Sequence, residues 1–211
     1  MSLRILYGTT NQAKLDSMRR ITADLGMEII GLKDLGKSIP QVKEDGKDPL
    51  ENALIKAKAY YEAFGMPVFS CDSGLYFEEV EEVLQPGTHI RRVHGRELSD
   101  EEMIAYYGGL AKACGGRLMA RYHNSVCAII DENNCFSSMD ESLYTESFIL
   151  SDKPHEKRVP GYPLDALSID IVTGEYYYNL KEKSVDKSAI EQGYKAFWEM
   201  VIKAMSEEKE N

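Results

Sequence analysis

The feature that most constrains this chain is a short apolar segment followed by a small polar loop and an amphipathic helix. Residues 3–7 predict a strand, and Gly8-Thr-Thr-Asn11 predicts a loop with Asn11 as the N-cap of the helix. Apolar residues then recur at helical spacing until Gly26, which predicts the helix end. Such a unit aims free backbone N–H groups and the positive end of a helix dipole at whatever lies above the loop. Lys14 either adds a formal charge there or is a solvated lysine of an ordinary capped helix.

A second helix is marked by Asp48-Pro-Leu-Glu51, with Asp48 as N-cap, proline at the first helical position and Glu51 three residues after the cap. Gly65 predicts its end. Asn52 and Lys56 are four residues apart and therefore share a face of this helix. Two interpretations of Glu51 stay open, since it is either a capping-box partner or a metal ligand beside Lys56.

The apolar run at residues 67–69 predicts a buried strand that stops at Ser70-Cys71-Asp72-Ser73-Gly74. Gly74 is expected to supply a backbone turn that other residues resist. A carboxylate at the mouth of a buried strand is where open α/β sheets place ligand groups, which makes Asp72 a candidate functional residue. The alternative is that Asp72 only caps the turn through its own backbone.

The remaining pattern alternates apolar and polar segments. Helices are predicted at residues 99–107, ending at Gly108-Gly109, and at 187–205. Strands are predicted at residues 28–31, 120–131, 143–150 and 166–172, with a hairpin return from Cys135. Residues 32–47 and 151–163 predict loops. Periodicity alone allows either an α/β or an α+β fold.

Composition excludes several classes of protein. A chain of 211 residues with a formal net charge of −10 does not suit broad binding to a nucleic-acid backbone, which needs a basic face. No apolar stretch is long enough to span a bilayer, and the N-terminus shows no signal-peptide pattern. None of the four cysteines forms a C-x-x-C pair, which disfavours a zinc site and favours reduced thiols in a cytoplasmic protein.

Four motifs, in order and spacing, together resemble the inosine triphosphate pyrophosphatase (ITPase-like) family. They are T-x-N-x-x-K at residues 9–14, E-N-A-x-x-K-A at 51–57, D-D-S-G-L at 71–75 with Cys71 in place of the first Asp, and P-G-x-x-x-x-R-x-x-G at 86–95. The second half is less similar. The family's G-F-G-Y-D-P segment appears as Gly161-Tyr-Pro-Leu-Asp165, and the base-reading His and Arg of its S-H-R-G-K-A segment are replaced by Val185 and Asp186.

The resemblance implies a hydrolase that cleaves a nucleoside triphosphate to the monophosphate and diphosphate with Mg²⁺, removing non-standard purine nucleotides such as ITP, dITP and XTP. It implies that Asp72, Glu51 and Lys56 are catalytic and that Glu51 and Asp72 bind the metal. Implied substrate-binding residues are Thr9, Thr10, Asn11, Lys14, Ser73, Gly74, Arg92, Tyr162 and Asp165. It also implies a homodimer and a single domain at residues 1–211, with a long twisted mixed sheet, flanking helices and two lobes around a central cleft.

The departures from the family pattern lead to two further expectations. Asp165 and Asp186 are hydrogen-bond acceptors, whereas the Arg that the family has in place of Asp186 is a donor, which predicts an altered base preference. Cys71 is a poor ligand for a hard metal, so the alternative function is a nucleotide-binding protein of the same fold with reduced or lost catalysis. A third option is hydrolysis of another phosphoanhydride without base reading. Tyr162 is either a base-stacking residue or a surface aromatic, and Arg92 is expected to face the nucleotide rather than close a salt bridge.

Overall fold

The computed structural model describes residues 3–78, 80–93, 95–180 and 188–207. The chain forms two compact units, which are described separately. The first comprises Met1–Ser73, Asn124–Tyr144 and Ser188–Asn211, and the second comprises Gly74–His123 and Thr145–Lys187. The long strands β3 (Val68–Phe77) and β6 (Arg117–Ile129) contribute residues to both units. That the two units form one domain spanning residues 1–211 stays a prediction.

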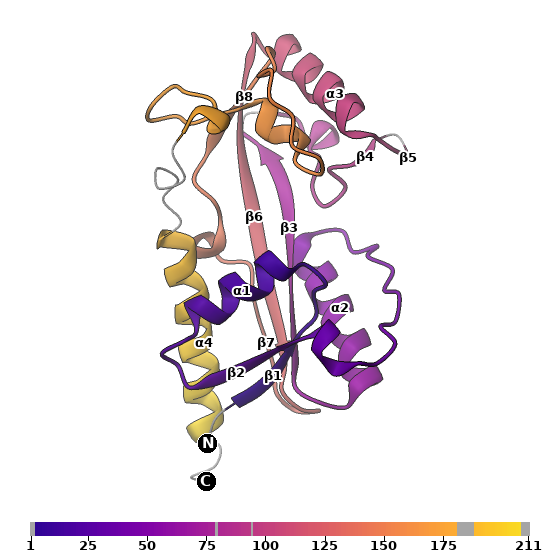
Figure 1. Ribbon diagram of the computed structural model, residues 1–211, viewed down its shortest axis with the longest axis vertical. Helices are drawn as coiled ribbons and strands as arrows, with labels where there is room; N and C mark the ends of the chain where they lie inside the picture. Colours follow the sequence, from indigo (N-terminus) through magenta and orange to yellow (C-terminus); the bar gives the residue numbers. More distant parts are fainter. Residues whose placement is uncertain (1–2, 79, 94, 181–187, 208–211) are drawn as a thin grey trace. The chain divides into compact units, whose positions relative to one another are not determined.

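The first unit carries the parallel part of the sheet (Figure 1). Strand β1 pairs in parallel with β2 and with β3, and β6 pairs antiparallel with β7. The strands are β1 (Leu3–Tyr7), β2 (Met27–Gly31) and β7 (Cys135–Ser138), and the helices are α1 (Gln12–Ile21), α2 (Pro49–Phe64) and α4 (Ser188–Glu207). Two short 3₁₀ helices, η1 (Leu32–Leu35) and η3 (Glu141–Leu143), complete it.

Both faces of this part of the sheet are buried. Tyr7 and Phe69 pack in one apolar cluster with residues of α1 and α4, whereas Leu6 and Val68 pack in another with residues of α2. Alternate residues of a strand point to opposite faces, so neighbouring residues such as Ile5 and Leu6 in β1, and Val68 and Phe69 in β3, are both apolar. Trp198 of α4 is fully buried, and its ring meets the Phe69 ring edge-on at 4.8 Å. Because both faces are covered, each residue of this part of β3 packs either toward α1 and α4 or toward α2.

The second unit is antiparallel. Within it β6 pairs with β8, and β8 pairs with β9. Its strands are β8 (Phe148–Ser151), β9 (Ser168–Ile169) and the hairpin of β4 (Arg92–Val93) and β5 (Arg96–Glu97), and its helix is α3 (Asp100–Ala113). Short 3₁₀ helices are η2 (Glu82–Leu84), η4 (Pro163–Ala166) and η5 (Tyr177–Asn179).

The predicted α/β fold with a long mixed sheet and flanking helices is confirmed, with seven strands in the main sheet of the described residues. The predicted end of α3 at Gly108-Gly109 is wrong, because the helix runs to Ala113 and buries Ala111 completely. Burial outweighs the low helix propensity of the two glycines. The strand predicted at residues 143–150 is also wrong in its first half, since only Phe148–Ser151 pairs, and the one predicted at 166–172 shrinks to Ser168–Ile169.

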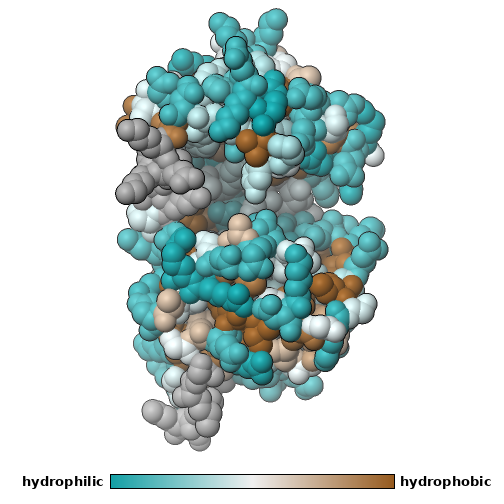
Figure 2. Space-filling view, in the orientation of Figure 1, coloured by the Kyte–Doolittle hydropathy of each residue, from teal (hydrophilic) through white to brown (hydrophobic). Residues whose placement is uncertain are grey.

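On the face shown in Figure 2 most exposed residues are hydrophilic, and hydrophobic ones appear among them in small groups. None of the helices in the described part of the chain is long and apolar enough to cross a bilayer.

Candidate functional site

The loop after β1 has the predicted geometry. Asn11 caps α1, its side-chain oxygen accepting the N–H of Lys14 at 3.2 Å, and Thr10, Asn11 and Lys14 are exposed. Gly8 begins this loop against β3 and donates its N–H to the Phe69 carbonyl at 2.7 Å. A Cβ on Gly8 would lie 2.2 Å from the Ser70 hydroxyl, so only glycine lets the chain approach β3 this closely. The first turn of α1 therefore begins close beside β3, and its predicted role as an anion cradle stays a prediction.

Lys56 is the centre of the charged cluster in the first unit. Its ammonium lies 2.8 Å from Asp72 Oδ1 and 2.8 Å from Glu44 Oε2. The Lys56 and Asp72 side chains are only 12% and 16% exposed. Burial lowers the pKa of the Lys56 ammonium, but the negative charges of Asp72 and Glu44 outweigh it and leave that pKa above its usual value. Lys56 therefore stays charged and holds two carboxylates around one point.

Asp72 lies in the middle of a strand and not at its end. The predicted stop at residues 70–74 is wrong, because β3 runs without a break from Val68 to Phe77. Gly74 makes no turn. It is needed because a Cβ there would lie 3.1 Å from the Gly87 backbone, with which Leu75 exchanges two hydrogen bonds. A close strand approach and a turn both require glycine, and the sequence alone does not separate them.

Glu51 has a partner of its own. Its carboxylate accepts the backbone N–H of Lys47 at 2.9 Å and pairs with the Lys47 ammonium at 2.9 Å. The backbone hydrogen bond and then the ammonium lower the pKa of the Glu51 carboxyl. Asp48 caps α2 as predicted, accepting the N–H of Glu51 at 2.9 Å. The structure thus connects Glu51 with Lys47 and Asp72 with Lys56, and a shared metal site of Glu51 and Asp72 stays a prediction.

Sequence reasoning missed Glu44, which lies in the segment predicted as loop. No periodicity or capping pattern distinguishes it. Its position depends on how residues 36–47 close on the start of α2, where the buried Asn52 side chain accepts the Gly46 N–H at 2.8 Å. A Cβ on Gly46 would lie 2.7 Å from the Glu51 Cβ, so the close approach of this loop requires glycine.

Cys71 and Ser73 lie on the other face of β3. Cys71 packs with the apolar cluster of α1 and α4, whereas Asp72 pairs with Lys56 on α2. Burial raises the pKa of the Cys71 thiol, and the nearby phenols of Tyr7 and Tyr194 have raised pKa values for the same reason. This thiol is neutral and cannot replace a carboxylate. The Ser73 hydroxyl donates to the Asn124 side chain at 2.7 Å, and both residues line a pocket of about 140 Å³ together with Lys14.

The remaining predicted site residues belong to the second unit. Arg92 is exposed in β4 and lines a pocket of about 230 Å³. The predicted salt-bridge alternative is made by its neighbour Arg91, which pairs with Asp100 at 2.7 Å. Tyr162 is 55% exposed, and Asp165 lies partly buried in η4. Val185 and Asp186 fall outside the described residues.

A comparison with protein-family models shows to which family this chain belongs. The model of the Ham1 family matches residues 5–146, about two thirds of the chain. This chain belongs to the Ham1 family. The matched region contains every predicted site residue from Thr9 to Arg92, and it leaves out Tyr162 and Asp165.

Curated relatives carry names that describe an activity. A dITP/XTP pyrophosphatase of Leptospira interrogans is 31% identical over 150 residues, which cover 70% of this chain and 74% of the relative. One of Symbiobacterium thermophilum is 34% identical over 129 residues, covering 60% of this chain and 61% of that relative. The chain therefore spans less than two thirds of the latter enzyme.

Solved structures support the family fold. A Ham1 protein from Coxiella burnetii superposes with a TM-score of 0.72 at 21% identity, covering 97% of this chain and 99% of that one. The Ham1 protein of Staphylococcus aureus gives a TM-score of 0.69, also at 21% identity, with 93% and 98% covered. At this identity the likeness shows the Ham1 fold over nearly the whole chain.

Proposed function

We propose that this Ham1-family protein hydrolyses a nucleoside triphosphate to the monophosphate and diphosphate, with non-standard purine nucleotides as its substrate class. The observation that carries the proposal is the cluster of Glu44, Lys56 and Asp72. Tyr60, one turn after Lys56 on α2, packs its ring against Gly8 at the start of the exposed Thr9–Lys14 cradle, which connects the cluster with the loop. A lysine-held carboxylate pair next to backbone N–H donors suits a triphosphate and its metal. The names of the dITP/XTP pyrophosphatases support the same reaction.

The donor set fits Mg²⁺. No group of three His, Cys, Asp or Glu side chains that could hold a metal occurs among the residues described. Mg²⁺ does not need such a group, since it is bound through one or two carboxylates plus water and substrate phosphate. We infer that the pair of Asp72 and Glu44 supplies the carboxylate that binds the metal, because both lie 2.8 Å from the same ammonium. When bound, the ion polarises the phosphoanhydride and neutralises developing charge.

The residues of the first unit divide the remaining work. Thr9, Thr10 and Asn11 with the first turn of α1 bind phosphate oxygens, and Lys14 adds a positive charge. Lys56 orients the two carboxylates and neutralises part of the charge on the bound phosphates. Asp72 orients the attacking water or accepts its proton. A metal-bound carboxylate is a poor base, so the presence of Glu44 lets one carboxylate serve the metal while the other serves the water.

The choice between Glu44 and Glu51 is testable by a matched pair of variants. Glu44→Gln is expected to lower the rate of diphosphate release about a hundredfold and to raise the Mg²⁺ concentration needed for half-maximal rate. Glu51→Gln removes the same charge from an exposed pair with Lys47 and is expected to change either quantity only a few-fold. The measurement is a Mg²⁺ titration of diphosphate release, with Mg²⁺ binding by calorimetry. A larger loss of rate and of Mg²⁺ binding in Glu51→Gln than in Glu44→Gln would instead support a metal site made by Glu51 and Asp72.

A panel of nucleotides tests the function itself. We expect diphosphate release from at least one of ITP, dITP, XTP, ATP and GTP, with a preference that differs from a hypoxanthine-specific enzyme because Val185 and Asp186 replace His and Arg. EDTA is expected to abolish it. Thermal stabilisation by a nucleotide without turnover supports the alternative, a binding protein of the same fold, which the neutral Cys71 favours. Release from inorganic triphosphate at the same rate as from every nucleotide supports a phosphoanhydride hydrolase that reads no base.

The proposal extends to a homodimer acting in the cytoplasm on a small-molecule nucleotide. The acidic net charge of −10 agrees with the absence of a nucleic-acid partner.

A further inference from the structure

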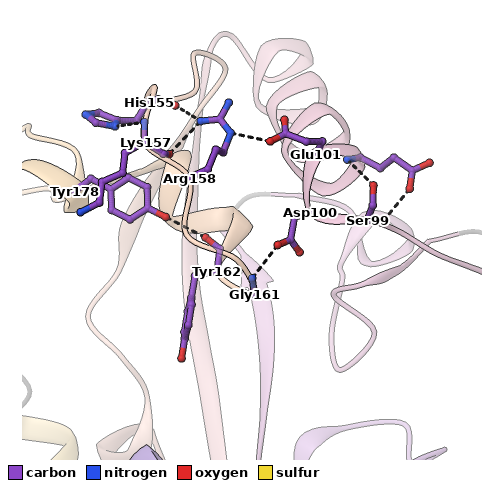
Figure 3. Close-up of polar contacts among 10 residues, drawn as sticks. Ser99, Asp100, Glu101, His155, Lys157, Arg158, Gly161, Tyr162 and Tyr178 are labelled. Carbon is purple, nitrogen blue, oxygen red and sulfur yellow. Dashed lines mark hydrogen bonds and ion pairs between the residues drawn. The ribbon is translucent and has the colours of Figure 1, made fainter.

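One carboxylate in the second unit joins two segments that are far apart in sequence. Asp100 Oδ1 accepts a hydrogen bond from Arg91 Nη2 at 2.7 Å. Asp100 Oδ2 accepts the Gly161 N–H at 2.8 Å, as Figure 3 shows. Arg91 precedes the predicted nucleotide contact Arg92, and Gly161 precedes the predicted stacking residue Tyr162. These predicted contacts come from separate motifs, and Asp100 belongs to neither.

Asp100 lies at the capped start of a helix. It occupies the first position of α3, whose N-terminus is closed by a capping box in which Ser99 and Glu102 each accept the other's backbone N–H. The neighbouring Glu101 pairs with Arg158 at 3.0 Å, and Arg158 also donates to the His155 carbonyl. The first turn of α3 therefore holds the loop of residues 155–162 at two points.

The other side of the loop is held as well. The Tyr178 hydroxyl donates to the Tyr162 carbonyl at 3.3 Å, and the His155 N–H donates to the Ala166 carbonyl at 2.7 Å. Gly161 has φ +84°, a left-handed conformation that favours glycine and aims its N–H at Asp100. In Figure 3 the Tyr162 ring points away from these polar contacts, and the residue is 55% exposed. The backbone on both sides of Tyr162 is fixed while its ring is free to receive a planar ligand.

We propose that Asp100 is a positioning residue for nucleobase recognition: it holds the Tyr162 loop and the Arg91–Arg92 segment in one arrangement. The proposal rests on the proposed function and adds a residue that touches no substrate. Without the carboxylate, Gly161 and Arg91 lose their common acceptor, and the Tyr162 ring samples several positions. Binding of the base must then order the loop, and the entropy lost in doing so weakens the affinity for the nucleotide. Phosphate binding by the first unit is unaffected.

The test compares ligands with and without a base. Asp100→Ala is expected to raise KM for the best nucleoside triphosphate about tenfold, the size of a lost stacking contact, with little change in kcat. The inhibition constant of inorganic triphosphate, which has no base, is expected to stay unchanged. Asp100→Asn keeps an oxygen for the Gly161 N–H and is expected to recover most of the loss. Asp131→Ala is the control, since it removes a carboxylate that, like Asp100, accepts backbone N–H groups, but in the hairpin turn of the first unit.

A double-mutant cycle identifies the route of the effect. In a Tyr162→Ala background, Asp100→Ala is expected to add little, because the residue that it positions is gone. Additive losses, or an equal loss of inorganic triphosphate binding, overturn the proposal. If wild-type protein turns over no nucleotide, the proposed function fails, and nucleotide dissociation constants of wild type and Asp100→Ala by calorimetry test the positioning role separately. Equal constants then overturn it.

Discussion

Replacing Asp72 with Asn is expected to lower kcat for diphosphate release about a thousandfold, in the range of a lost catalytic base. The amide has nearly the shape of the carboxylate, but it supplies neither a charge for the metal nor a proton acceptor for water. Its oxygen still accepts from Lys56, which also keeps Glu44 at 2.8 Å, so the fold should survive. The measurement is single-turnover diphosphate release at saturating Mg²⁺, with circular dichroism and the thermal midpoint as checks of folding.

The control for this variant is chemical. Chelation of divalent ions by EDTA should reduce wild-type turnover to the level of Asp72→Asn, and added Mg²⁺ should restore the wild type only. A folded Asp72→Asn protein that keeps more than about a tenth of the wild-type rate would remove Asp72 from the centre of the mechanism.

Replacing Lys56 with Met should have the largest effect on stability. The variant leaves Asp72, which is 16% exposed, facing Glu44 without the ammonium between them. Removing one partner of a buried ion pair is strongly destabilising, and we expect a loss of about 3 kcal/mol in the free energy of unfolding. The matched control is Lys47→Met, which removes an ammonium 2.9 Å from a carboxylate at an exposed site, and it should leave the urea midpoint nearly unchanged. Equal midpoints for the two variants would show that burial does not strengthen the Lys56 pairs.

The ion pairs of Lys56 with Asp72 and Glu44 predict how the stability of the fold depends on pH. The pKa of Lys56 in the folded protein lies above its usual 10.5, since Asp72 and Glu44 outweigh the effect of burial. A raised pKa of a cation stabilises the fold fully below the unfolded value, and that stabilisation is lost as pH rises through the folded value. The difference between wild type and Lys56→Met should therefore be constant near neutral pH and shrink above about pH 10.5. Urea unfolding at several alkaline pH values measures it, and a difference that grows with pH would contradict the ion-pair account.

Local signals in the sequence were reliable where the chain itself determines conformation. Asn11 and Asp48 cap their helices as predicted, because a capping side chain needs only a partner three residues away. The turn predicted at Gly74 was wrong because glycine is required there by the close approach of the Gly87 backbone, which is not a local neighbour in the sequence. Adjacent residues of a strand point to opposite faces, so Cys71 and Asp72 lie on different sides of β3. Which helix each side chain meets is known only from the tertiary structure.

By itself the sequence determined the N-terminal helix caps, the small polar loop before α1, the alternation of strands and helices, and the motifs of the family. These features depend on neighbouring residues, whose separation is set by the covalent chain. Only the tertiary structure decided that Glu44 shares Lys56 with Asp72, and that Asp100 joins Arg91 to Gly161. Such pairings form where loops fold back over the ends of helices. The local sequence of a polar loop does not indicate which of its charged residues pairs with a residue distant in the chain.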